Sequence, residues 1–267
     1  MDLTPVAHLS AIRGRLPFIN FFDGFRTSHE IQKIETWDYK DLKLMCDMKE
    51  VKAFKNDALN PNHPEERGSA QNPDIFFQAR EAFNIAYDDM PKIVEEYMDK
   101  VNKKIGTNYK LFNYYGAKDA KTVIVAMGSV CETINETIDY LRVKTKDKIG
   151  VIKVRLYIPF SKEHFVKAIP TSCKNLVVLD RTKESGSIGE PLYLDVLASI
   201  KGSNFEKISV LNGRYGLGSK NTTPEQIAAV FKNTRKKRFT ICIEDDVTKL
   251  SLKEAVHLIQ HLKNSLL

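Results

Sequence analysis

The sequence predicts an α/β protein in which a mostly parallel sheet lies between two layers of helices. From residue 122 onward, short apolar runs rich in β-branched residues alternate with segments of helical periodicity, as in TVIVAMG followed by residues 130–143. Such βα units build parallel sheets that are covered by helices on both faces. The chain has 267 residues and 42% hydrophobic content, enough for one large domain or two ordinary ones with a real core.

The elements of this second part follow one another in a regular order. KIGVIKVRLYIPF, NLVVLDR, KISVLNG and RFTICIE are predicted strands, and KEHFVKAI, PLYLDVLASIK and TPEQIAAVFKN are predicted helices. The last helix has the expected start, because Thr223 is a good N-cap and Pro224 suits the first helical position.

The first part of the chain predicts an incomplete α/β segment. VAHLSAIRGR is typical of a helix, and LPFINFF of a buried strand anchored by its phenylalanines. A helical pattern covers residues 38–59, and NPNHPEERGSAQNP then predicts a long irregular excursion. A further helix is expected to begin at Pro91 and to end at Gly106.

Composition and charge narrow the classes of function. No apolar run has the length of a membrane span, and the N-terminus lacks the pattern of a secretory signal, so we expect a cytoplasmic protein without a membrane partner. The net charge is +7, but the one dense basic cluster, residues 235–238, has no interleaved aromatic residues, which argues against a nucleic-acid partner. Four scattered cysteines without a C-x-x-C pair indicate free thiols and no metal site.

The stretch FFDGFRTSHE, residues 21–30, places charged groups directly after the predicted strand. Ligands of open α/β sheets bind beyond the carboxyl ends of strands, so Asp23, Arg26 and His29 are candidates for the rim of a cleft or for a domain contact. The structural alternative is a turn at Asp23, with Thr27 and Glu30 forming a helix capping box.

Three further polar loops follow predicted strands. DRTKESGSIGEP contains Arg181, for which a domain contact is favoured over catalysis. GRYGLGSK does not fit a nucleotide fingerprint and is interpreted as a turn whose glycines allow positive φ. The step from Gly128 to Ser129 precedes a helix whose N-terminus could take an anion, although ordinary capping is favoured. No catalytic residue is assigned.

Several long stretches together resemble one family. LPFINFFDGFRTSHEIQKIE, RGSAQNPDIFFQAREA, VIVAMGSVCETINETIDYL, VVLDRTKESGSIGEPLYLDV and IEDDVTKLSL are similar to pyruvate:ferredoxin oxidoreductases, in the family's order. The resemblance covers the chain to about Leu252. It implies an internal fragment of a longer protein, with residues 1–109 as the end of the first, thiamine-pyrimidine-type domain. Residues 110–252 are then a second domain similar to the C-terminal domain of transketolases, and 253–267 a divergent helical tail.

The resemblance also implies a function for the intact enzyme. That function is the oxidative decarboxylation of pyruvate to acetyl-coenzyme A, with ferredoxin, flavodoxin or NADP as the electron acceptor. Thiamine diphosphate, iron–sulfur clusters and coenzyme A belong to the intact enzyme, and we expect no cofactor in this chain, because the motifs that bind them are absent and each cluster needs four thiolates. The expected partners are the remaining domains of the parent enzyme and, in the intact protein, a second copy. The alternative is a stand-alone, non-catalytic scaffold or binding module of the same fold.

Overall fold

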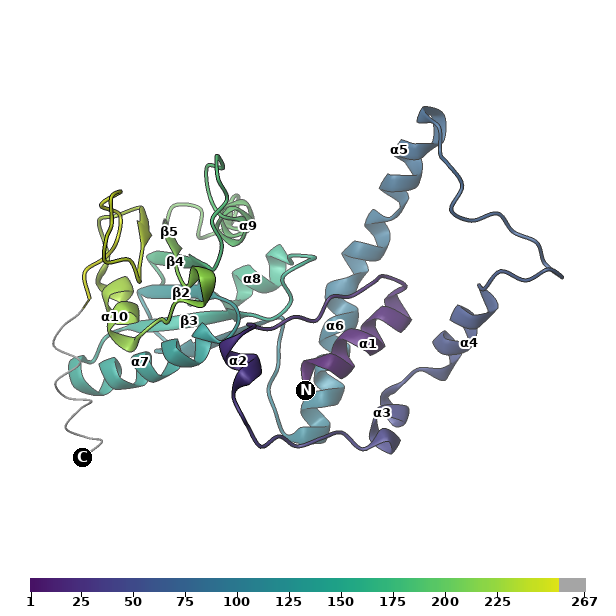
Figure 1. The fold of residues 1–267 in the computed structure, drawn as a ribbon, viewed down its shortest axis with the longest axis horizontal. Coiled ribbons are helices and arrows are strands. Elements are labelled where there is room, and N and C mark those ends of the chain that lie inside the picture. Colours follow the sequence, from purple (N-terminus) through teal and green to yellow (C-terminus); the bar gives the residue numbers. More distant parts are fainter. Residues whose placement is uncertain (255–267) are drawn as a thin grey trace. The chain divides into compact units, whose positions relative to one another are not determined.

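The computed structural model describes residues 1–254, apart from the side chains of Arg26 and Thr27. The chain forms two compact units (Figure 1). Unit 1 comprises Met1–Phe21 and Ile31–Leu111, and unit 2 comprises Phe22–Glu30 and the chain from Phe112 onward. The assignment of these units to the family's domains stays a prediction, and the expected helical tail lies mostly outside the described residues.

Unit 2 is built on a six-stranded sheet with the order β1-β3-β2-β4-β5-β6. All neighbouring pairs are parallel except β1 and β3. The register aligns Val123 of β2 with Gly150 of β3 and with Leu176 of β4. The strands are β1 Phe112–Gly116, β2 Thr122–Ala126, β3 Ile149–Val154, β4 Asn175–Asp180, β5 Ser209–Arg214 and β6 Arg238–Thr240.

Helices cover both faces of this sheet, which confirms the predicted α/β class (Figure 1). Helix α7 packs against α10, and α8 packs against α9. The predicted cap of α10 is present as a full capping box, in which Thr223 and Gln226 exchange side-chain and backbone hydrogen bonds. The helices of unit 2 are α2 Arg26–His29, α7 Val130–Thr145, α8 Lys162–Ala168, α9 Pro191–Ile200 and α10 Pro224–Lys232, with a short 3-10 helix η1 at Leu217–Ser219.

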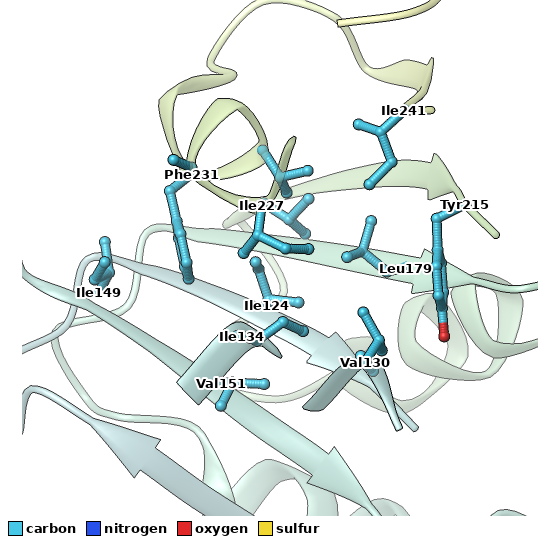
Figure 2. Close-up of a cluster of buried hydrophobic side chains, with 14 of the residues drawn as sticks. Ile124, Val130, Ile134, Ile149, Val151, Leu179, Tyr215, Ile227, Phe231 and Ile241 are labelled. Atoms are coloured by element: carbon cyan, nitrogen blue, oxygen red, sulfur yellow. The ribbon is translucent and has the colours of Figure 1, made fainter. Parts of the chain in front are cut away.

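The core of unit 2 lies between the sheet and the pair α7 and α10 (Figure 2). Ile134 of α7 and Ile227 of α10 are fully buried against Ile124 of β2. Because β4 is buried along almost its whole length, alternate residues of this strand face covered surfaces on both sides of the sheet. A continuous apolar run such as that of β4 is therefore a strand whose two faces are both buried.

Unit 1 contains helices and irregular segments in its described part. Helix α1 packs along α6 and also contacts α4. Val6 and Leu9 of α1, and Met90, Val94 and Val101 of α6, are buried. The helices are α1 Leu3–Gly14, α3 Tyr39–Met45, α4 Met48–Asn56, α5 Pro73–Ala82 and α6 Asn84–Ile105.

Three predictions for unit 1 are wrong in detail. LPFINFF forms no strand, and Phe21 is 64% exposed, because no described strand of unit 1 can pair with it and an unpaired strand leaves its backbone groups without partners. The helix expected over residues 38–59 is two helices, because the side chain of Asp47 caps a new start by accepting from the amide of Lys49. Pro91 lies inside α6 and not at its start.

Other local predictions for unit 1 hold. Gly106 ends α6 with a φ of 72°, and its amide bonds to the carbonyl of Asn102. Residues 60–72 contain no helix and no regular strand, as the composition indicates. No helix among the described residues has the length and apolar character needed to cross a membrane.

Candidate functional site

The carboxyl ends of β2 and β4 form the topological switch point of the sheet. After β2 the chain passes through α7 to β3 on one side, and after β4 it passes through α9 to β5 on the other. In open α/β sheets the crevice between two such strands is the usual place for a ligand. The residues that follow these two strands therefore define the candidate site.

The carboxylate of Asp23 occupies this position. One of its oxygens accepts a hydrogen bond from the backbone amide of Ser129, at the start of α7, and the other forms an ion pair with the guanidinium of Arg181, directly after β4. Burial disfavours the ionised form of Asp23, but the hydrogen bonds from Ser129 and the charge of Arg181 outweigh it and hold the pKa of the carboxyl below its usual range. Asp23 is thus an internal anion at the N-terminus of a helix.

The backbone around this contact is shaped to admit the carboxylate. Gly128 has a φ of 83°, and a Cβ atom there would lie 2.8 Å from an oxygen of Asp23. Arg181 is fixed from a second direction, because its Nε donates to the carbonyl oxygen of Gly216 at 3.0 Å. Beside them the buried hydroxyl of Tyr215 donates to the carbonyl of Met127 at 3.4 Å, and burial raises the pKa of Tyr215.

The structure brings together two of the four candidate residues named from the sequence. Asp23 and Arg181 are in contact although they lie 158 positions apart. His29 is exposed, and its ring packs on Phe25 within the same helical turn. Helix α2 begins at Arg26, so the backbone of Thr27 lies inside the helix and not at the N-cap position that the prediction gave it.

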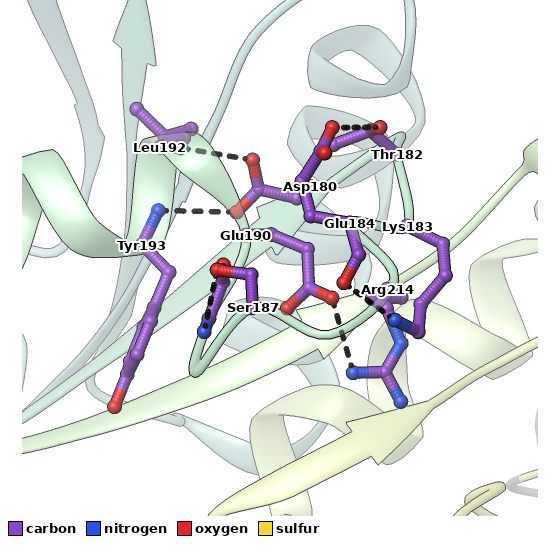
Figure 3. Close-up of polar contacts among 10 residues, drawn as sticks. Asp180, Thr182, Lys183, Glu184, Ser187, Glu190, Leu192, Tyr193 and Arg214 are labelled. Carbon is purple, nitrogen blue, oxygen red and sulfur yellow. Dashed lines mark hydrogen bonds and ion pairs between the residues drawn. The ribbon is translucent and has the colours of Figure 1, made fainter.

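A second carboxylate stabilises the neighbouring helix. Asp180, the last residue of β4, accepts hydrogen bonds of 3.1 Å from the amides of Leu192 and Tyr193 in the first turn of α9 (Figure 3). Burial raises the pKa of Asp180 to about 6, even though the two amide hydrogen bonds favour its charged form. The residue is 2% exposed, so its role is to hold α9 against the strand.

A buried ion pair lies at the end of β5. The guanidinium of Arg214 donates to one carboxylate oxygen of Glu190 at 3.3 Å, and both side chains are almost fully enclosed (Figure 3). The other oxygen of Glu190 has no hydrogen-bond partner among the described residues. Sequence reasoning missed this pair. Its only local signal was an arginine at the end of an otherwise apolar strand.

Two groups expected for the intact enzyme, a diphosphate at the switch point and an iron–sulfur cluster, were compared with the described residues. Asp23 already uses the amide of Ser129 and the guanidinium of Arg181, so a diphosphate placed at the switch point would meet a carboxylate. Three of the four cysteines are buried and the fourth is half-buried, and all are free. Within residues 1–254, no group of three or more His, Cys, Asp or Glu side chains is arranged to hold a metal ion.

Two family models match the chain in succession. Residues 1–99 match the model described as pyruvate flavodoxin/ferredoxin oxidoreductase, thiamine diphosphate-binding, and residues 120–227 match pyruvate:ferredoxin oxidoreductase core domain II. The chain is 56% identical over 94% of its length to a pyruvate-flavodoxin oxidoreductase of Enterobacter agglomerans, and 52% identical over 97% to a pyruvate:ferredoxin oxidoreductase of Moorella thermoacetica. A pyruvate dehydrogenase [NADP(+)] of Cryptosporidium parvum is 49% identical over 94% of the chain.

The chain spans 22% of the length of the Enterobacter and Moorella relatives and 13% of the Cryptosporidium one. A solved 2-oxoglutarate:ferredoxin oxidoreductase of Magnetococcus marinus matches 52% of this chain and 22% of its own at 16% identity, with a TM-score of 0.32, which carries no structural argument. The two successive domain models and the identity of about one half along nearly the whole chain place this protein in the pyruvate:ferredoxin/flavodoxin oxidoreductase family.

Proposed function

We propose that this chain is a scaffold portion of an enzyme that oxidatively decarboxylates pyruvate to acetyl-coenzyme A and passes the electrons to ferredoxin, flavodoxin or NADP. The observation that carries the proposal is the identity of 56% to a pyruvate-flavodoxin oxidoreductase over 94% of the chain. Relatives named for three different acceptors are similar to this chain. The acceptor is therefore left open within this set.

Exposed apolar side chains of unit 1 support a role as part of a larger protein. Nine large apolar side chains in the described part of this unit are more than 60% exposed: Ile19, Phe21, Ile31, Tyr39, Leu44, Phe54, Leu59, Phe77 and Ile85. Extended apolar surface is costly in water and is usually covered by another domain or subunit. The remaining length of the relatives offers domains that can cover it.

The chemistry of the reaction is assigned to those remaining domains. In those domains thiamine diphosphate would supply the decarboxylation chemistry, and iron–sulfur clusters would supply the path for the electrons. In the same proposal coenzyme A accepts the acetyl group, and the intact enzyme is a homodimer. Asp23 and Arg181 are positioning residues, which hold residues 22–30 against the sheet of unit 2.

Activity measurements on two forms of the protein test this proposal. The 267-residue chain alone is expected to show no coenzyme A-dependent oxidation of pyruvate with an artificial electron acceptor, and the full-length protein that contains it is expected to turn over. Turnover by the isolated chain, or stoichiometric binding of thiamine diphosphate to it in calorimetry, would refute the scaffold assignment.

A stand-alone, non-catalytic scaffold is the second candidate. It is favoured by the internal anion at the switch point, which leaves that ligand position filled by the chain itself. The two candidates predict different coding sequence on either side of this segment. An open reading frame that continues into thiamine-binding and cysteine-rich segments supports the enzyme. An open reading frame bounded by stop codons on both sides of the segment supports the stand-alone scaffold.

A further inference from the structure

A pocket lies at the same edge of the sheet as the switch point, beyond the carboxyl ends of β5 and β6. It encloses about 380 Å³, which falls in the size range of small-molecule sites. All of its walls come from unit 2, mainly from the turn after β5 and from residues 240–248. Its apolar lining is formed by Tyr215, Leu217, Ile241, Ile243 and Val247.

Two buried polar side chains line the pocket together with this apolar wall. Thr240 is 7% exposed, and its hydroxyl has no hydrogen-bond partner among the described residues. Arg214 is 5% exposed, and its bond to Glu190 is long for a charged pair at 3.3 Å. A buried hydroxyl without a partner is costly, so its presence in a pocket wall points to a group that is supplied from outside the chain.

The charged groups around the pocket favour an anion. Lys183 and Lys220 line it and are exposed, and the ammonium of Lys183 also donates to the carbonyl oxygen of Glu184 at 2.7 Å. The nearby carboxylate of Asp246 is committed to its own loop, where it accepts from the amides of Thr248 and Ser251 and from the hydroxyl of Thr248. Asp245, also in the lining, is exposed. The charged donors of the lining are Arg214, which is paired with Glu190, together with Lys183 and Lys220.

We propose that this pocket binds a small organic anion. A carboxylate or phosphate group of the ligand meets Arg214 and the hydroxyl of Thr240, and a planar apolar body lies against Leu217 and Ile241. Lys220 adds a longer-range attraction. The pocket adjoins the switch-point contact of Asp23, because Tyr215 and Gly216 line it, but its own proposed ligand does not depend on the proposed function.

Isothermal calorimetry on the 267-residue chain tests the proposal with four probes. Benzoate presents a carboxylate and adenosine monophosphate a phosphate, and benzamide and adenosine are their neutral counterparts. We expect at least one of the anions to bind with a stoichiometry near one, and its neutral counterpart to bind at least tenfold more weakly. Each anion is compared with its own neutral counterpart, which isolates the effect of the charged head group. Failure of both anions to bind at millimolar concentration would overturn the proposal.

Three variants locate the bound anion. Thr240→Val keeps the shape but removes the unpartnered hydroxyl, so it is expected to raise the melting temperature without ligand and to weaken binding by about three- to tenfold. Lys220→Ala is expected to weaken binding about threefold, and Lys167→Ala, an exposed lysine on α8, is expected to leave it unchanged. If neither Thr240→Val nor Lys220→Ala weakens binding more than the Lys167 control, the anion binds elsewhere and the proposal is wrong.

Discussion

Replacing Asp23 by alanine removes two hydrogen bonds to a charged acceptor at once, one from the amide of Ser129 and one from the guanidinium of Arg181. A hydrogen bond to a charged group contributes about 1.5–3 kcal/mol. The side chain of Arg181 is 29% exposed, so water can solvate part of the freed cation. We therefore expect the free energy of unfolding of unit 2 to fall by about 2–4 kcal/mol, below the sum of two full contributions.

The assay must report on unit 2 alone, because two units can unfold separately and a single transition is not assured. Hydrogen exchange, followed by mass spectrometry on peptides that cover residues 22–30 and 128–145, gives local opening free energies. A cycle of Asp23→Ala, Arg181→Ala and the double variant isolates the pairwise contribution, for which we expect about 1–2 kcal/mol. Asp119→Ala serves as the control, because its pair with Lys148 is fully exposed and its loss should leave exchange unchanged.

The pH dependence gives an independent check on the same carboxylate. Because the pKa of Asp23 is lower in the folded chain, its contribution is present above about pH 4 and is lost as the pH falls through the folded value. A change below about 0.5 kcal/mol for Asp23→Ala at pH 7, the size of an ordinary surface substitution, would refute the reasoning. If the effects of Asp23→Ala and Arg181→Ala simply add in the double variant, the pairwise contribution is zero and the reasoning is also refuted.

Further predictions concern the same edge of the sheet and the last helix. The folded pKa of Asp180, about 6, lies above the value of about 4 in an unfolded chain, so its contribution is present below pH 4 and decreases by up to about 3 kcal/mol as the pH rises to 6. Thermal melts across this range should show the slope, and Asp180→Asn should flatten it. Gly128→Ala should destabilise by about 1–3 kcal/mol in urea unfolding, and by less in an Asp23→Ala background, where the clash is absent. Thr223→Ala should cost about 1 kcal/mol in the same assay, and no measurable loss would contradict the capping box.

The sequence predicted the βα units of unit 2 well because their signals are local. A strand buried on both faces is a continuous apolar run, and a helix such as α10 carries its own cap and proline. Strand β1 was missed, since FNYYG is a half-buried edge strand with polar and aromatic residues and no apolar run. The strand predicted for LPFINFF is absent for the opposite reason. Its composition favours a strand, but a strand needs a partner strand, and the described part of unit 1 provides none.

The candidate site was predictable only in part. Asp23 and Arg181 were each singled out because they follow apolar runs, but no pattern in the sequence links residues that lie 158 positions apart. The position of Ser129 at a helix start was recognised, and an anion or ordinary capping was expected there. That Asp23 of the same chain supplies the anion was not predicted. The pocket beyond β5 and β6 depends on how two turns fold over each other, and the glycines of GRYGLGSK indicated only that a turn was present.

Residues 22–30 belong to unit 2, although the residues before and after them in the sequence belong to unit 1. The backbone therefore changes unit at three places, after Phe21, after Glu30 and after Leu111, and a single cut cannot yield two complete pieces. A gene fragment that starts at residue 112 would encode the whole sheet but would leave the first turn of α7 and the guanidinium of Arg181 without their shared anion. Recombination that exchanged only the sheet-bearing segment between relatives would separate Asp23 from Arg181, so the two segments are expected to be inherited together.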